Sequence, residues 1–377
     1  MAQQQGNRNG NIKILSVVWY KVLPAKFGGQ KAVAFFNEHL GRYAKLVCIC
    51  SANNIVEQTS YKIDTSLPTS KAQFFNPFIW IKIYRLAKLY TCTHLILEFP
   101  YHGIAGVICK KLLRIKLIVN THNIEYLRFK EQKKWWWRLL YYYERWTLKS
   151  SDVVFFKTDA DKMAGVEKFS VPAQKTSVVP YGATQIKHAN RKDANALICR
   201  RHDIKKTETI ILFAGTLDYQ PNAEAVLSIA EKLIPLLNQG SFSYKIIICG
   251  RNHLQKFDYL SQLENEHLVM AGEVADIETY FLASTVFINP VLTGGGVQTK
   301  IIDALSHHLN VVCFDSRGQG IAYAEKKIFT VEDGDWKALA NAVIKASANS
   351  YSTEAAFFAE YNWNAIADKA YQKLATL

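Results

Sequence analysis

With 377 residues, 49% of them hydrophobic and 21% charged, the chain is long enough for two folded domains and too apolar to be intrinsically disordered. Its longest apolar stretch, near residues 95–120, is interrupted by Glu98, Pro100 and two lysines, which argues against a membrane-spanning helix. The net charge of +14 points to an anionic partner, and the seven cysteines show no metal-ligand spacing, as expected of reduced thiols in the cytosol.

The first half of the chain alternates short apolar runs with amphipathic ones, after a polar lead-in at residues 1–10 that is expected to be disordered. Strands are predicted at residues 11–19, 44–51, 94–99 and 116–120. Helices are predicted at residues 31–42, after a Gly28–Gly29 turn, and at 77–90. This alternation ends near the Pro180–Gly182 turn.

The second half restarts the same alternation. Strands are predicted at residues 207–215, 244–250, 267–271, 286–289 and 310–314, with helices at 223–237, 277–282, 299–306 and 336–348. Continuous apolar strands that alternate with helices indicate parallel sheets covered on both faces. The sequence therefore predicts an α/β protein with two doubly wound, Rossmann-like domains, at residues 11–187 and 207–350, joined by a polar and basic linker at 188–206.

The strongest local motif is a strand that runs into three glycines and then into a helix. Gly294, Gly295 and Gly296 allow main-chain N–H groups to approach an anion, and the helix start after them adds partial positive charge. In that helix Lys300 can meet a phosphate, and Asp303 can accept hydrogen bonds from ribose hydroxyls. The motif indicates a diphosphate site, although a flexible loop with a surface ion pair explains the residues equally well when they are taken alone.

Three further strand ends carry residues of interest. Gly215 and Thr216 follow the first strand of the second half, and Asn222 is expected to cap the next helix. Arg251 follows the second strand, and Gly272, Glu273 and Val274 form a turn whose main chain could contact a flat base. Ligands of doubly wound sheets bind at the carboxyl ends of strands. Each of these turns, taken singly, fits a structural role as well as a functional one.

In their order along the chain, these motifs resemble the retaining glycosyltransferases of the GT-B fold, family 4, also called glycosyl transferases group 1. The resemblance also includes the Gly28–Gly29 turn, Thr121–Glu125 and Val179–Gly182. It implies two Rossmann-like domains that face a central cleft, with the acceptor bound by the first domain and a UDP- or GDP-sugar by the second. It further implies that no metal and no cofactor besides the nucleotide sugar is needed, and that residues 351–377 include a helix that crosses back to the first domain.

The resemblance also implies roles for single residues. His122 matches the histidine that contacts the transferred sugar, Gly29 the glycine beside the donor phosphate, and Asp303 the position of the ribose-binding glutamate. Gly295 replaces the first of the family's two glutamates, and the basic pair expected after Gly215 is absent. Lys300 and Arg251 are the available substitutes. The candidate catalytic residues are therefore His122, Lys300 and Arg251, and the candidate donor-binding residues are Gly29, Gly215, Thr216, Glu273, Val274, Gly294, Gly295, Gly296, Val297 and Asp303.

Several residues have a structural alternative. His122 could cap a helix or satisfy a buried main-chain group, and Glu125 could only support its loop. Asp159-Ala160-Asp161 resembles a metal-binding motif, but it opens a predicted helix, where acidic residues cap the N-terminus, and we interpret it as a cap. Glu98, Tyr101 and His102 follow a strand, where lining an acceptor site and packing a loop are equally compatible with the sequence.

Positive charge is concentrated in the first half of the chain. Residues 1–183 hold 27 Lys and Arg against 11 Asp and Glu, a net charge of +16, whereas the remainder has a net charge of −2. Within this half, Lys133–Trp146 mixes basic and aromatic residues on a predicted helix, which fits contact with an anionic membrane and also fits packing against the core. We expect a cytoplasmic protein at the inner face of the cell membrane.

The sequence thus predicts a retaining, hexosyltransferase-type enzyme that transfers a sugar to a lipid-linked or glycan acceptor. Two other interpretations stay open. A sugar-nucleotide epimerase or phosphorylase would keep the fold and change the chemistry, and the charge of the first half would also suit a non-catalytic protein that binds membrane or nucleic acid. The series of strand-end motifs argues against the second of these, so no nucleic-acid partner is expected.

Overall fold

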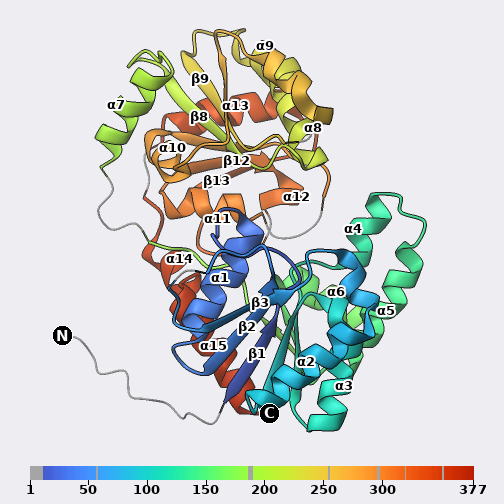
Figure 1. Cartoon of the computed structure of the whole chain (residues 1–377). Helices are drawn as coiled ribbons and strands as arrows, with labels where there is room; N and C mark the ends of the chain where they lie inside the picture. The colour runs from blue at the N-terminus through green and yellow to red at the C-terminus, as the bar shows by residue number, and fades with distance from the viewer. Residues whose placement is uncertain are drawn as a thin grey trace, which may run out of the picture. The chain divides into compact units, whose positions relative to one another are not determined.

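The computed structural model describes residues 12–56, 58–185, 190–253, 255–294, 298–318, 320–349 and 352–377. These residues form two compact units (Figure 1). The first unit contains the described residues up to Gly182 together with Tyr361–Leu377, and the second contains Ala183–Gly294 and Gln298–Glu360. The expected division near residue 187 lies close to this boundary, and each unit is described below by itself.

A seven-stranded parallel sheet forms the centre of the first unit. Its strands are β1 (Lys13–Val17), β2 (Lys45–Ser51), β3 (Lys62–Leu67), β4 (His94–Glu98), β5 (Lys116–Asn120), β6 (Val153–Phe156) and β7 (Thr176–Val178). Their order in the sheet is β3-β2-β1-β4-β5-β6-β7, and each neighbouring pair is parallel. The chain therefore winds in one direction from β1 to β3 and in the other from β4 onward, with the switch point between β1 and β4.

The second unit repeats this arrangement with six parallel strands. They are β8 (Thr209–Ala214), β9 (Tyr244–Cys249), β10 (Leu268–Gly272), β11 (Val286–Asn289), β12 (Asn310–Phe314) and β13 (Ile328–Val331). The order is β10-β9-β8-β11-β12-β13, which places the switch point between β8 and β11. The predicted pair of Rossmann-like domains is confirmed.

Helices cover the sheets of both units. In the first unit they are α1 (Gly28–Leu40), α2 (Pro77–Leu89), α3 (Gly103–Leu113), α4 (Glu125–Glu131), α5 (Trp137–Ser150), α6 (Asp159–Phe169) and α15 (Trp363–Ala375). In the second unit they are α7 (Arg191–Arg201), α8 (Gln220–Ser228), α9 (Ile234–Leu237), α10 (Ile277–Ala283), α11 (Thr299–Ser306), α12 (Asp315–Gly318), α13 (Trp336–Ser347) and α14 (Ala355–Glu360). Short 3-10 helices lie at Lys71–Phe75, Pro100–His102, Ala173–Lys175 and Gln255–Leu263, and a π-helical turn at Ile229–Leu233 joins α8 to α9.

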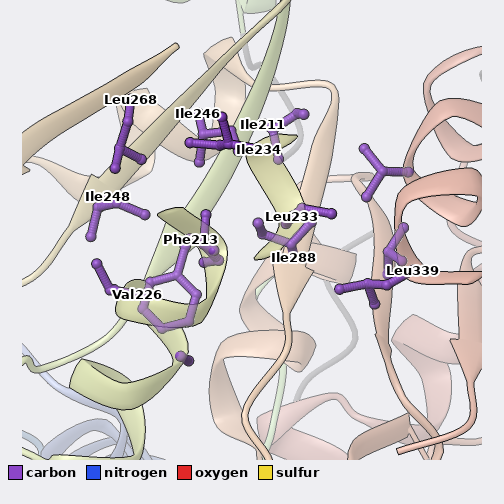
Figure 2. Close-up of a cluster of buried hydrophobic side chains, with 14 of the residues drawn as sticks. Ile211, Phe213, Val226, Leu233, Ile234, Ile246, Ile248, Leu268, Ile288 and Leu339 are labelled. Atoms are coloured by element: carbon purple, nitrogen blue, oxygen red, sulfur yellow. The ribbon is translucent and has the colours of Figure 1, made fainter. Parts of the chain in front are cut away.

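The core of the second unit shows why the continuous apolar strands fold into a sheet (Figure 2). Ile211 and Phe213 on β8, Ile246 and Ile248 on β9, and Ile288 on β11 all point into one fully buried cluster. Helices α8 and α13 close this cluster from one side. Each buried aliphatic or aromatic side chain of this size contributes about 1.5–3 kcal/mol relative to an exposed one, so the strands of this cluster are fixed by burial rather than by local propensity.

The C-terminal helix belongs to the first unit. Helix α15 packs on α1, and the ring of Trp363 at its start lies against Phe35, His39 and Tyr181. Gly182 approaches this ring so closely that a Cβ atom there would lie 2.3 Å from it. Tyr361–Leu377 therefore belongs to the first unit, whereas the chain up to Glu360 belongs to the second.

The structure also differs from the expected elements. Residues 191–201, expected in a linker, form α7, and β3, β6, β7 and β13 were not predicted as strands. The helix expected at residues 223–237 begins at Gln220 and is interrupted by the π-helical turn. Asn222 lies inside α8 and does not cap it. All seven cysteines are free, and no helix among the described residues is both long and apolar enough to span a bilayer.

Candidate functional site

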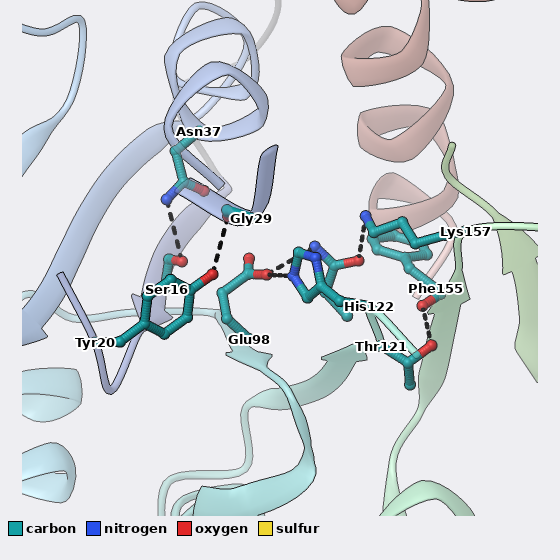
Figure 3. A network of polar contacts seen from close by, with 10 residues as sticks. Ser16, Tyr20, Gly29, Asn37, Glu98, Thr121, His122, Phe155 and Lys157 are labelled. Carbon is teal, nitrogen blue, oxygen red and sulfur yellow. Dashed lines mark hydrogen bonds and ion pairs between the residues drawn. The ribbon is translucent and has the colours of Figure 1, made fainter. Parts of the chain in front are cut away.

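In the first unit, the candidate residues gather where β1, β4, β5 and β6 end, beside the switch point. His122 follows β5, and its Nε2 lies 2.6 Å from Oε2 of Glu98, the last residue of β4 (Figure 3). The Glu98 side chain is fully buried, and that of His122 is 10% exposed. Because a carboxylate can only accept, Nε2 of His122 carries the proton, which leaves Nδ1 as the acceptor nitrogen.

Two further buried polar residues fix this pair. Asn120 donates from Nδ2 to Oε2 of Glu98 at 2.9 Å and accepts from Nζ of Lys157 at 2.9 Å. Burial lowers the pKa of His122, and the nearby Glu98 only partly offsets this, so the imidazole is neutral at physiological pH. Burial also lowers the pKa of Lys157 to about 8. His122 thus follows the end of β5 as a neutral imidazole held in one orientation.

Aromatic rings flank the same histidine. The ring of Phe99 stacks on that of His122 with their centroids 4.5 Å apart. Phe99 has a φ of 72°, a backbone conformation that is rare for a bulky residue and is found where the surrounding structure enforces it. His102, by contrast, is buried against Phe74, and burial lowers its pKa to about 4. Of Glu98, Tyr101 and His102, which the sequence offered as candidates, Glu98 is the one with a described hydrogen bond to His122.

Glu125 has a supporting role. Its carboxylate accepts hydrogen bonds from Tyr101 Oη, from Arg128 Nη2 at 2.6 Å and from Asn123 Nδ2 at 3.0 Å. The buried Glu144 accepts from the main-chain N–H groups of Glu125 and Tyr126, both at 2.9 Å, at the start of α4. Burial raises the pKa of Glu144 to about 8. These contacts hold the loop that carries His122.

Gly29 lies in the first turn of α1, where main-chain N–H groups have no partner within the helix. Its carbonyl oxygen accepts a hydrogen bond from Tyr20 Oη at 3.0 Å (Figure 3). Apart from its chain neighbours and the nearby backbone of α1, no described atom lies within 4 Å of the place where a Cβ atom would stand on Gly29. Packing within the first unit therefore does not require glycine at this position. The open space would allow a ligand to bind at the start of α1.

In the second unit, Lys300 and the end of β8 come together. Lys300 Nζ, in the first turn of α11, donates to Oδ1 of Asn222 at 3.0 Å and lies 4.5 Å above the ring of Phe213. Asn222 in turn donates to the carbonyl oxygen of Thr216 at 2.9 Å. A Cβ atom on Gly215 would approach Asn222 Nδ2 to 2.8 Å, so this glycine allows the close contact. Asn222, expected only as a cap, is the link between the two motifs.

Burial and, to a smaller extent, the positive charge of Arg317 together lower the pKa of Lys300 to about 7. Close to neutral pH the ammonium is therefore partly deprotonated when no anion is bound. A phosphate beside Lys300 would favour the charged form, because an opposite charge stabilises it in a poorly solvated place. The arrangement therefore suits a site that binds an anionic ligand.

Arg251 is placed differently from the expectation. Its Nε lies 3.1 Å from Oδ2 of Asp218, and the other oxygen of Asp218 accepts from the main-chain N–H of His253 at 2.8 Å. The imidazole of His253 continues this chain of contacts to Oε2 of Glu273, at 3.0 Å. Arg251 and Glu273 thus belong to one polar chain beside β9 and β10, and the charge of Arg251 is already balanced by a carboxylate.

The remaining candidates of the second unit are only partly described. Gly294 has a φ of 95°, and a Cβ atom there would lie 2.3 Å from Tyr219 Oη, so the position requires glycine. Asp303 and Val274 are half-buried, the former one turn after Lys300 in α11. Gly295, Gly296 and Val297 lie outside the described residues. The structure therefore places the two ends of the glycine-rich motif.

Asp159-Ala160-Asp161 opens α6, but the N-cap is Thr158 and not, as predicted, one of the aspartates. The side chain of Thr158 accepts from the main-chain N–H of Asp161 at 3.0 Å, and the two aspartates lie in the first turn of the helix. Their negative charge complements the helix dipole there. Throughout the described ranges, no three His, Cys, Asp or Glu side chains are grouped in a way that could hold a metal ion.

The basic and aromatic segment Lys133–Trp146 divides between core and surface. Trp136 packs against Phe129 in a tilted arrangement and Trp137 stacks on Tyr126, so these two rings pack inward. Trp135 is 88% exposed, and Leu139, Tyr142 and Trp146 are exposed along α5. Core packing therefore applies to Trp136 and Trp137, and contact of the exposed side chains with a membrane stays a prediction.

Family comparisons agree with this architecture. The family described as Glycosyl transferases group 1 matches residues 208–349, and Glycosyltransferase Family 4 matches residues 48–184. Together the two matched ranges cover most of the chain and lie one in each unit. No protein of curated function matches the sequence.

Solved structures with the same fold span nearly the whole chain. A glycosyltransferase of Rickettsia africae is 17% identical over 98% of this chain and 99% of its own, with a TM-score of 0.74. The sucrose-phosphate synthase of Thermosynechococcus elongatus is 16% identical over 97% and 98%, with a TM-score of 0.76. HepE of Anabaena, in complex with UDP, is 15% identical over 97% and 100%, with a TM-score of 0.77. At these identities the likeness shows the shared fold.

Proposed function

Since this chain belongs to the family 4, or group 1, glycosyltransferases, we propose that it transfers a sugar from a UDP-sugar to an acceptor with retention of anomeric configuration. The observation that carries the donor half of this proposal is Lys300, a poorly solvated lysine at the start of a helix that follows a glycine-rich loop at a switch point. UDP is favoured over GDP because HepE, of the same fold, is described in complex with UDP.

Catalysis in this proposal depends on electrostatic stabilisation and positioning. As the bond between the sugar and the diphosphate breaks, negative charge grows on the leaving group, and Lys300 together with main-chain N–H groups stabilises it. Asp303 binds the ribose, and Glu273 and Val274 border the base. Gly29 has the role beside the donor phosphate that the family resemblance implies. His122 contacts the transferred sugar through Nδ1, with its orientation set by Glu98. Arg251, already paired with Asp218, has a minor role.

The proposal is tested by binding and by product analysis. Nucleotides and UDP- and GDP-sugars are screened by thermal shift against the wild type and Lys300→Met, and the anomeric configuration of the product is read by NMR. Stabilisation of the wild type by UDP compounds, lost in the variant, supports the assignment. Equal stabilisation of both proteins would place the diphosphate elsewhere, and an inverted product would refute retention.

We propose further that the enzyme needs no metal ion, because protein groups supply the positive charge beside the diphosphate. Activity should then survive an excess of EDTA. Loss of activity on chelation, with recovery after addition of Mg²⁺ or Mn²⁺, would contradict this. Membership of a glycosyltransferase family favours transfer over the epimerase, phosphorylase and non-catalytic interpretations considered from the sequence.

We propose a lipid-linked acceptor at the anionic inner face of the membrane, because one helical layer of the first unit is basic and apolar at its surface. Helices α2, α3 and α5 pack side by side on one face of the sheet (Figure 1). Phe78 on α2 is 79% exposed, Phe75, Ile81 and Leu89 are exposed beside it, and Leu112 is exposed on α3. Together with Trp135 and Leu139, these side chains extend the surface well beyond the segment that the sequence singled out.

The charges on helices α2, α3 and α5 indicate which kind of partner this layer binds. The three helices carry eight Lys and Arg, and their one acidic residue, Glu144, is buried. Each basic residue near an anionic lipid surface contributes about 1 kcal/mol, and this attraction is screened by salt. Exposed rings and aliphatic side chains among the charges suit the interface between headgroups and acyl chains. An anionic lipid surface therefore fits better than a neutral protein partner.

Vesicle sedimentation tests the membrane proposal. Phe78→Ser with Ile81→Ser, and Trp135→Ser with Leu139→Ser, should each weaken binding to vesicles that contain anionic lipid, whereas Ile344→Ser, a 39% exposed residue of the second unit, should not. Added salt should weaken binding of the wild type. Equal and negligible binding to anionic and neutral vesicles would refute the proposal, as would a stable dimer in solution that these variants dissociate.

A further inference from the structure

Arg317 contacts the glycine-rich segment from a neighbouring strand end. It lies in α12, directly after β12, and its guanidinium donates three hydrogen bonds to main-chain carbonyl oxygens after β11. Nε donates to Val291 at 3.0 Å, Nη2 to Leu292 at 2.7 Å and Nη1 to Gly294. We propose that Arg317 is a positioning residue of the donor site, which holds segment 291–294 in shape and adds a positive charge to the glycine-rich segment that precedes Lys300.

The geometry favours arginine at this position. Three carbonyl groups, from residues that are nearly consecutive, are met by three different N–H groups of one planar side chain. Lysine has a single ammonium and cannot meet three separated carbonyl groups with the same fixed fork. The segment needs such support at Gly294, whose positive φ and close approach to Tyr219 restrict it to one conformation. Arg317 therefore fixes the main chain of residues 291–294 relative to the end of β12.

The charge of Arg317 is the second part of the inference. Within the described part of the chain, Lys300 contacts the Asn222 amide and the Phe213 ring, which are both uncharged. Arg317 adds a positive charge whose effect on Lys300 is repulsive. Two like charges in a poorly solvated place destabilise each other, and an anion that lies near both relieves that repulsion. A bound diphosphate would thus be stabilised by both cations.

This inference also accounts for a departure from the family pattern. The basic pair expected after the first strand of the second domain is replaced by Thr216, Leu217 and Asp218. Arg251 is paired with Asp218, so it is a weak substitute. Arg317 instead bonds only to uncharged carbonyl oxygens in the contacts described, and it retains its net positive charge. Lys300 and Arg317 then supply the two charges that the expected pair would have supplied.

Two variants separate the two parts of the proposal, which rests on the donor site proposed above. Arg317→Lys keeps the charge and removes the three-way contact, whereas Arg317→Gln removes the charge as well. Arg200→Gln, at the exposed end of α7 in the same unit, is the matched control. Hydrogen exchange of peptides that cover residues 288–294 is measured without nucleotide, and UDP affinity is measured by titration calorimetry between pH 6.5 and 8.5.

Faster exchange at residues 291–294 is expected in both Arg317 variants and not in Arg200→Gln. Arg317→Lys should weaken UDP binding by about tenfold and leave the pH midpoint of binding unchanged, because the neighbouring charge is kept. Arg317→Gln should move that midpoint upward by at least about half a pH unit, because Lys300 loses a repulsive neighbour.

Unchanged exchange in both variants would overturn the positioning role, whatever happens to UDP. An unchanged midpoint in Arg317→Gln would overturn the charge effect. If the wild type binds no UDP at any pH, the proposed donor site fails, and the exchange measurement alone then decides whether Arg317 holds the loop.

Discussion

Affinity for UDP should fall as pH rises above 7 if Lys300 meets the diphosphate. Lys300 has a pKa of about 7 in the empty protein, because burial disfavours its charged form. Binding of an anion requires the ammonium, so above that pH the complex must take up a proton. The terminal phosphate of UDP loses its last proton near pH 6, and it therefore stays ionised over the range that matters.

The size of the effect follows from the pKa. Each pH unit above the pKa of the empty site costs about 1.4 kcal/mol in binding free energy, as long as the pKa in the complex stays higher than the pH. Because about half of the Lys300 side chains are already deprotonated at pH 7, the affinity should fall by about 1.7 kcal/mol, or roughly sixteenfold, between pH 7 and 8.5. The Lys300→Met variant should bind more weakly at pH 7 and show a nearly flat profile.

Titration calorimetry in buffers of different ionisation enthalpy measures both quantities. Near pH 8.5 the wild type is expected to take up close to one proton for each UDP bound, and Lys300→Met is expected to take up none. Tight UDP binding without proton uptake, or an equal pH profile in the variant, would refute the assignment of Lys300 to the diphosphate.

Three other changes test the remaining structure. His122→Ala should lower transfer at least about tenfold and cost about 1–3 kcal/mol of stability, because the buried Glu98 loses a hydrogen bond; wild-type turnover would exclude the role in transfer. Gly29→Ala should fold normally and transfer sugar poorly. Gly250→Ala should fold poorly, because the added Cβ would lie 1.9 Å from a main-chain oxygen. A lower melting temperature for Gly29→Ala than for Gly250→Ala would contradict the packing argument. Burial raises the pKa of Glu144 to about 8, so its contribution to stability is present below about pH 4.5 and is lost as pH rises to about 8. Glu144→Gln should therefore make the free energy of unfolding less dependent on pH in this range. An unchanged pH dependence of that free energy, measured by chemical denaturation, would contradict this prediction.

Much of the fold could be predicted because its strands are continuous apolar runs. The β4, β5 and β8 segments are buried almost throughout. A strand that is buried on both faces appears in the sequence as a continuous apolar run, which can be recognised without knowledge of the neighbouring strands. Shorter strands such as β7, with three residues, are set by pairing in the sheet and leave no such signal. Helix α7 was missed because only Ala194 and Ile198 of its eleven residues are buried, so its composition is that of a linker.

The candidate site shows a similar division. The positions of His122 and Lys300 could be predicted, since residues that follow strands in doubly wound folds lie at the ligand edge. The partners of these residues could not be predicted. Glu98, Asn120 and Lys157 lie at the ends of three different strands, which become neighbours only through the strand order of the sheet. Arg251 and Arg317 each follow a strand, and the sequence does not reveal that the first is paired with Asp218 while the second contacts the glycine-rich segment.

The central claim is that this chain uses a UDP-sugar as the donor for glycosyl transfer, and release of UDP tests it most directly. The purified full chain is incubated with UDP- and GDP-sugars, with and without vesicles that carry a bacterial lipid extract as the source of acceptors, and nucleoside diphosphate release is followed. We expect release from at least one UDP-sugar, stimulated by the extract and reduced at least about tenfold in Lys300→Met. A folded wild-type protein that releases no UDP from any of these donors, or that releases GDP alone, would contradict the account.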